Sequence, residues 1–108
     1  MAYDAGSAQM LRDALEPLPV VEKRMFGGIA FMVNGHMACG VHKNGAMFRV
    51  GRQADSTARA LPGVGPMVFT GKPMDGYVEI SDAALGDDAT RAQLIALALA
   101  FNKTLAPK

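Results

Sequence analysis

The side chains best suited to chemistry in this chain are Cys39 and two histidines, His36 and His42, which stand three residues to either side of it. A cysteine becomes a good nucleophile when a cation, a histidine or a helix N-terminus lowers the pKa of its thiol. On an extended strand, odd spacing places both histidines on the face opposite Cys39. This arrangement disfavours a Cys-His pair, and we expect Cys39 to be a buried structural residue.

A metal or acid–base site is also not indicated by the residue pattern. Metal binding requires several Cys, His or carboxylate side chains that converge on one point, and no third ligand is evident beside the two histidines. Asp87 and Asp88 are adjacent carboxylates, but they precede an apolar helical pattern, where acidic residues cap a helix and favour the positive end of its dipole. We therefore predict no catalytic residues, no metal site and no cofactor.

Cationic side chains offer a different chemistry, the binding of an anion. The candidate anion-binding residues are Arg24, Arg49 and Lys72, around a basic cleft between the Gly27-Gly28 bend and the loop that carries Lys72. The alternative is that these charges are solvated and protect the edges of a sheet. Because 11 basic and 10 acidic residues leave a net charge of only +1, direct contact with nucleic acid is not expected.

Turn signals and hydrophobic periodicity predict the elements that position these residues. Asn34-Gly35 is a strong hairpin signal, because a type I′ turn needs positive φ at both central residues. Ser7 is the expected cap of a first helix. The fold class is predicted to be α+β, with an antiparallel meander sheet of about six strands packed by N- and C-terminal helices in two layers. The expected strands cover residues 20–26, 29–33, 37–42, 46–50, 67–70 and 77–81, and the expected helices cover 8–16, 52–61 and 88–105.

Alternation along the strands divides their side chains between two faces. The predicted core face is covered by the last helix and carries Ile29, Phe31, Val33, Met37, Cys39, Val41, Ala46, Phe48 and Val50. The opposite face carries Ala30, Met32, Ala38, Gly40, His42, Met47 and Arg49.

The second face is small and largely apolar, whereas a solvated face would be expected to carry Lys, Glu and Thr. An exposed apolar patch often marks an interaction site. One interpretation is that the first helix, or the helix after Val50, covers this face within the chain. The other is that it contacts a second copy, as a homodimer, or an unidentified protein partner. The candidate interaction surface consists of Ala30, Met32, Ala38 and Met47.

Length and composition limit the remaining possibilities. One hundred and eight residues, half of them hydrophobic, are enough for a single domain over residues 1–108. No apolar run approaches the roughly 20 residues that cross a membrane, and the N-terminus carries no secretory signal. A single cysteine cannot form an internal disulfide, which favours a reducing, cytoplasmic location.

Four segments together resemble the N-terminal domain of the TfoX/Sxy competence regulators, over nearly the whole chain from about Gln9 to Leu105. These segments are Arg-Met-Phe-Gly-Gly at 24–28, the Asn34-Gly35 hairpin, Ala-Met-Phe-Arg-Val at 46–50 and Gly-Tyr-Val-Glu-Ile at 76–80. The resemblance implies an α+β fold, a bacterial source and a link to regulation of DNA-uptake genes. It supplies no catalytic residues, and we interpret the chain as a stand-alone version of this domain.

Two hypotheses for function follow. The leading one is a small, non-enzymatic interaction or regulatory domain that acts by protein–protein contact. The alternative is a small-ligand or nucleic-acid-related binder or enzyme that uses the basic cleft near the Gly27-Gly28 bend. The two differ in a simple observation, because the alternative requires Arg24, Arg49 and Lys72 to converge around one concavity.

Overall fold

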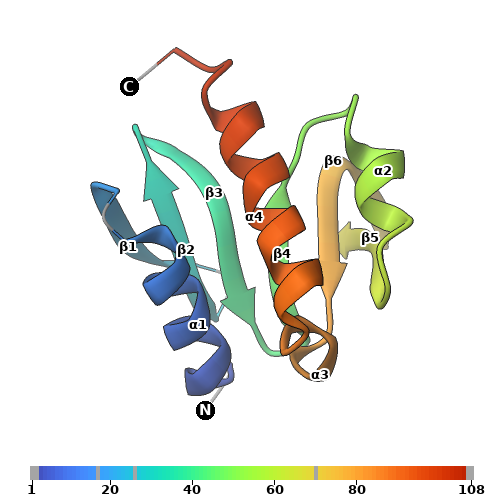
Figure 1. The fold of residues 1–108 in the computed structure, drawn as a ribbon, viewed down its shortest axis with the longest axis horizontal. Helices are drawn as coiled ribbons and strands as arrows, with labels where there is room; N and C mark the ends of the chain where they lie inside the picture. Colours follow the sequence, from blue (N-terminus) through green and yellow to red (C-terminus); the bar gives the residue numbers. More distant parts are fainter. Residues whose placement is uncertain (1–2, 17, 26, 70, 107–108) are drawn as a thin grey trace.

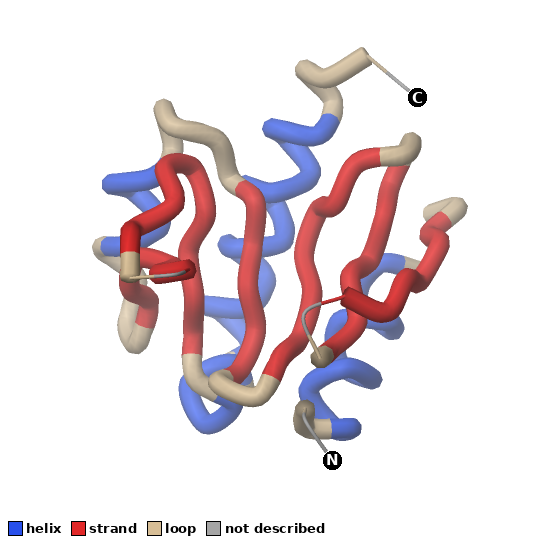
Figure 2. The backbone as a smooth tube through the Cα atoms, turned by 180° about the vertical axis from the view of Figure 1, so that it is seen from behind, coloured by secondary structure: helices blue, strands red, loops and turns tan. Residues whose placement is uncertain are grey.

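A computed structural model describes residues 3–16, 18–25, 27–69 and 71–106. The described residues contain one antiparallel sheet of six strands in the order β1-β2-β3-β4-β6-β5. All the helices drawn lie on one face of it, in front of the sheet in Figure 1 and behind it in Figure 2. The predicted α+β class, with terminal helices packed on an antiparallel sheet, is confirmed. The strands are β1 (Val20–Met25), β2 (Gly28–Val33), β3 (His36–His42), β4 (Gly45–Arg49), β5 (Val64–Phe69) and β6 (Lys72–Ile80), and the helices are α1 (Ala5–Leu15), α2 (Asp55–Arg59), α3 (Asp82–Leu85) and α4 (Asp88–Asn102).

The first four strands form the predicted meander. Asn34 and Gly35 have φ angles of 55° and 84°, as the type I′ turn between β2 and β3 requires. After β4 the chain passes through α2 and returns as the β5–β6 hairpin. The second strand of that hairpin, β6, pairs with β4 on its other side, so β5 is an edge strand.

The core lies between the sheet and its helices. Phe31 and Phe48 are fully buried there, and α4 runs across the central strands (Figure 1). Six of the residues predicted for the core face belong to this cluster, and Ile29 packs against it. The core cluster formed by the helices and the sheet consists of Ala8, Leu11, Leu15, Phe31, Cys39, Val41, Ala46, Phe48, Val50, Ala58, Val78, Ile80, Leu85, Leu94, Ile95 and Ala98.

Among the described residues, no helix combines the length and hydrophobicity needed to cross a lipid bilayer.

The predicted place of Met37 on the helix-covered face is wrong. Phe31 lies opposite Cys39 in the β2–β3 ladder, but its neighbour Met32 lies opposite Met37, so β3 contains one extra residue, Ala38. A bulge of this kind reverses the alternation of side chains beyond it. Met37 therefore shares a face with Met32, away from the helices.

The predicted face of His36 is also wrong, because the same bulge lies between His36 and Cys39. The sequence places it opposite Cys39, whereas its partner in the ladder is Val33, on the helix side of the sheet. Its Nε2 atom lies 2.7 Å from the carbonyl oxygen of Ala106, in the segment that follows α4. His36 thus contacts the C-terminal segment and is remote from His42 at the other end of β3.

The helix caps differ in part from the sequence prediction. Asp4, rather than Ser7, caps α1, because its Oδ2 accepts the backbone N–H of Ser7 at 2.7 Å. The buried Ser7 hydroxyl instead donates to Asp82 Oδ1 at 2.6 Å and ties α1 to α3, a short helix that the sequence pattern did not reveal. Asp87 caps α4 as predicted, and its hydrogen bonds from Thr90 lower the pKa of the Asp87 carboxyl.

The second hairpin is longer than predicted. Residues 71–76 were expected to form a loop, but β6 begins at Lys72 and runs to Ile80. Its register against β5 is irregular between Pro66 and Val68, and this irregularity accommodates several extra residues of β6. Gly76, with φ of 82°, lies within the irregular stretch.

Candidate functional site

The face of the sheet opposite the described helices, here called the helix-free face, carries two rows of paired residues. Residues paired across neighbouring antiparallel strands point to the same side. The apolar row consists of Val21, Met32 and Met37, from β1, β2 and β3. The central row crosses all six strands and contains Lys23, Ala30, Gly40, Met47, Glu79 and Gly65.

Of the four predicted surface residues, Ala30, Met32 and Met47 belong to these rows, and Ala38 is the unpaired residue of the bulge. The four are not equally accessible. Ala30, Ala38 and Met47 are buried, and Met32 is half-buried. Helices of the described chain pack on the other side of the sheet, so neither α1 nor α2 provides the intramolecular cover considered from the sequence (Figure 2). Whether this face binds a partner stays a prediction.

The exposed apolar area of this face lies toward β1. Val21 is 59% exposed, and its neighbours in the apolar row, Met32 and Met37, are half-buried. The sequence identified Met32 but missed Val21 and Met37. Val21 is on a strand whose alternation was not assigned, and the bulge at Ala38 hides the orientation of Met37.

Glu79, the member of the central row on β6, lies beside His42 of β3. The backbone N–H of Asn44 donates to His42 Nδ1 at 3.1 Å, so the proton of that ring is on Nε2. Nε2 lies 3.1 Å from Glu79 Oε2, although off the line of a good hydrogen bond. The side chain of His42 is 9% exposed and that of Glu79 is 29% exposed.

The three predicted anion-binding residues do not form one site. Arg24 is exposed on the edge strand β1, opposite Ile29, and two strands separate it from Arg49 on β4. Lys72 is exposed at the turn between β5 and β6. Among these three cations only Arg49 lines the cleft described below, which does not include the Gly27-Gly28 bend.

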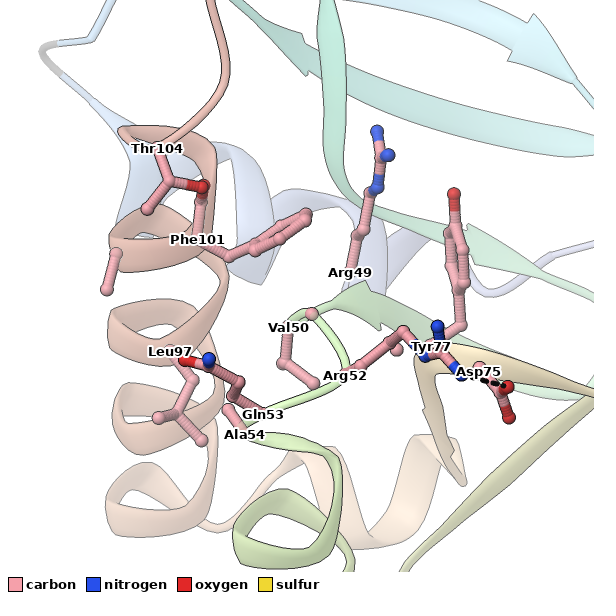
Figure 3. Close-up of a pocket in the computed structure, with 13 residues that line it drawn as sticks. Arg49, Val50, Arg52, Gln53, Ala54, Asp75, Tyr77, Leu97, Phe101 and Thr104 are labelled. Carbon is pink, nitrogen blue, oxygen red and sulfur yellow. Dashed lines mark hydrogen bonds and ion pairs between the residues drawn. The ribbon is translucent and has the colours of Figure 1, made fainter.

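A cleft of about 750 Å³ opens between the C-terminal half of α4, the end of β4 and the irregular part of β6 (Figure 3). Its centre is Arg49, which stands between two aromatic rings. The guanidinium carbon lies 5.3 Å from the ring centroid of Phe101 on α4 and 5.7 Å from that of Tyr77 on β6. The sequence analysis missed the contact with Tyr77, because it depends on the β4–β6 pairing that places Arg49 opposite Tyr77.

Two backbone features hold the ring of Phe101 in this cleft. Gly51 has φ of 84°, and a side chain there would strike the Phe101 ring, so the ring packs directly on the backbone. The carbonyl oxygen of Gly76 accepts the N–H groups of Val50 at 2.8 Å and of Gly51 at 3.1 Å. These bonds hold the end of β4 against β6 beside the cleft.

The sequence profile of the TfoX N-terminal domain matches residues 13–102 of the 108-residue chain. The chain belongs to this family. No curated protein and no solved structure gives a significant match. The segments on which the TfoX resemblance rests lie at the entry to β2, in the β2–β3 turn, on β4 and on β6. Arg49 and Tyr77 of the cleft both belong to these segments.

The single cysteine of this TfoX domain is buried in the core, 1% exposed. Burial raises the pKa of the Cys39 thiol from an ordinary value of 9.0 to about 12. In the described residues, no group of three Cys, His, Asp or Glu side chains is placed to hold a metal ion. Cys39 therefore has the environment of a structural residue rather than of a nucleophile.

We expect the native Cys39 thiol to react with a disulfide reagent at least about a hundredfold more slowly than the same thiol in urea, because the thiolate is the reacting form. Equal labelling rates in the presence and absence of urea would contradict the buried position.

The stability of the fold should also depend on the Cys39 thiol at high pH. Below pH 9 the thiol is protonated in both the folded and the unfolded chain. Above pH 9 the thiol of the unfolded chain ionises first, so the free energy of unfolding falls as the pH rises toward 12.

Proposed function

We propose that this TfoX N-terminal domain is a non-enzymatic regulatory domain of the competence-regulator type, which acts by protein–protein contact through its helix-free face. The proposed occupant of that face is a second copy of the chain. The observation that carries the proposal is the apolar row of Val21, Met32 and Met37, which remains accessible on a side of the sheet without a helix. The buried lone thiol of Cys39 fits a reducing cytoplasm.

The charges of the central row support association with a second copy. The charged members of the row are Lys23 on β1 and Glu79 on β6, and the row continues to Gly65 on the edge strand β5. If two copies meet face to face about a two-fold axis that is parallel to the strands and passes over β3, the strand order of one copy runs in reverse over the other. Ala30 and Met47 are buried within each copy, so the contact would involve the accessible side chains of Lys23 and Glu79. Lys23 of each copy then lies opposite Glu79 of its partner, a self-complementary arrangement of the kind that two-fold interfaces require.

Exchange of these two charges tests the proposed geometry. The wild-type chain is expected to be a dimer, and Lys23→Glu or Glu79→Lys alone should weaken it by about tenfold, since each creates like-charge contacts at two symmetric positions. The double variant restores opposite charges and should recover most of the lost affinity. Sedimentation velocity over a dilution series gives the dissociation constants.

Lys43→Glu is the matched control, because Lys43 is an exposed cation in the β3–β4 turn and outside both rows. It changes the net charge by the same amount as Lys23→Glu but should leave the dimer unchanged. Thermal unfolding of each variant establishes that the monomers remain folded. A double variant as weak as the single ones would contradict the two-fold arrangement.

A further inference from the structure

We propose that the cleft around Arg49 binds a monocarboxylate carried by an apolar group. The cleft is separate from the apolar row, so this proposal does not depend on dimer formation. The lining residues combine one oriented guanidinium with mainly apolar walls. Pockets that bind small ligands commonly have this character, and a volume of about 750 Å³ lies within their usual range.

The orientation of Arg49 is the first argument. Phe101 and Tyr77 flank the guanidinium at 5.3 and 5.7 Å, distances at which a cation is attracted to an aromatic ring. Among the described residues, no side chain or backbone oxygen accepts a hydrogen bond from Arg49, and no carboxylate pairs with it. A fork of N–H donors held between two rings is therefore left free for a carboxylate, which arginine binds through two parallel hydrogen bonds.

The charge of the cleft selects a monoanion. Its charged lining residues are Arg49, Arg52 and Asp75, which leave one net positive charge. Arg52 Nη2 lies 3.5 Å from Asp75 Oδ2 in an exposed pair at the mouth of the cleft, drawn as a dashed line in Figure 3. The Asp75 carboxylate offsets the charge of Arg52 and would repel a doubly charged phosphate. One carboxylate is sufficient to balance the remaining charge on Arg49.

The apolar walls of the cleft favour a ligand whose carboxylate is attached to an apolar group. Leu97, Ala100 and Phe101 come from successive turns of α4, and Val50 lies across from them at the end of β4. Figure 3 shows Phe101 projecting from α4 toward Arg49, with Leu97 on the same helix and Val50 at the end of β4. An aromatic or branched aliphatic group beside the carboxylate would be buried against this surface, whereas acetate would leave it in water.

Binding of simple acids to the ¹⁵N-labelled protein tests the proposal. Phenylacetate and the tripeptide acetyl-Gly-Gly-Phe, each with a free carboxylate, are titrated and compared with their neutral amides by amide chemical shifts. The carboxylates should shift Gly51, Gly76 and Phe101, and each should bind at least about tenfold more tightly than its amide, because a charge-assisted bidentate contact is lost in the amide. A stronger response to the tripeptide would identify a peptide C-terminus as the source, and a stronger response to phenylacetate a free small acid.

Arg49→Gln, which retains a donor but removes the charge, should weaken carboxylate binding at least about tenfold. Arg24→Gln is the matched control: it removes one exposed arginine on β1 and should bind as the wild type does. The proposal is overturned if neither acid shifts the cleft up to its solubility limit, if acid and amide bind alike, or if Arg49→Gln and the wild type have equal affinity. The comparison of acid with amide uses the unaltered chain and stands even if the arginine variant unfolds.

Discussion

Phe48→Ala should lower the free energy of unfolding by about 3–5 kcal/mol, the usual cost of removing a large aromatic side chain from a core. Phe48 is fully buried between Cys39 and Val78 in the middle of the sheet, under α4. The helices cannot close the resulting space without leaving their other contacts, so a cavity would remain. Urea denaturation measures the loss as a lower midpoint with an unchanged slope.

Leu18→Ala is the control for this substitution. Leu18 is 40% exposed in the segment between α1 and β1, and its replacement should change the free energy of unfolding by less than about 0.5 kcal/mol. A similar loss for both variants would mean that the helix-covered face of the sheet has been assigned wrongly.

Gly28→Ala should destabilise the fold by about 3 kcal/mol or more, because overpacking a rigid site forces the backbone to move. A methyl group at Gly28 would fall directly on the carbonyl oxygen of Val41 on the neighbouring strand. The obstacle is backbone rather than a movable side chain, so β2 and β3 would have to separate where β2 begins. The structural role of the second glycine in the Gly27-Gly28 pair is thus close approach of two strands.

Gly65→Ala gives the matched comparison, since Gly65 also lies in a strand but has nothing within 4 Å of the position its methyl group would occupy. This variant should unfold at nearly the same urea concentration as the wild type. If Gly28→Ala were equally harmless, the tight β2–β3 contact would be incorrect.

The sequence predicted much of this fold because its signals are local. The Asn34-Gly35 turn, the cap at Asp87 and the alternation of β4 each depend on residues within a few positions of one another. The misplacement of Met37 has a different origin. The extra residue, Ala38, is defined only by pairing with β2, and alternation within β3 alone contains no trace of it.

The candidate site depended on long-range pairing and was predicted less well. Arg49 was identified as a candidate, but with the wrong companions, since Arg24 and Lys72 lie elsewhere on the sheet. Its actual neighbours are Tyr77 and Phe101, which reach it through the order of the strands and the path of α4. Neither the insertion of β6 beside β4 nor the overlap of α4 with the end of β4 can be deduced from local patterns.

The most direct test of the account is the mass of the chain in solution, measured by light scattering for the wild type and for Met32→Glu. Met32 occupies the middle of the apolar row and is half-buried, so a charge there should disrupt contact between copies without unfolding the monomer. The account predicts twice the mass of one chain for the wild type and the mass of one folded chain for the variant. A wild-type monomer at all concentrations, or a variant that remains dimeric, would contradict the proposal that the helix-free face joins two copies.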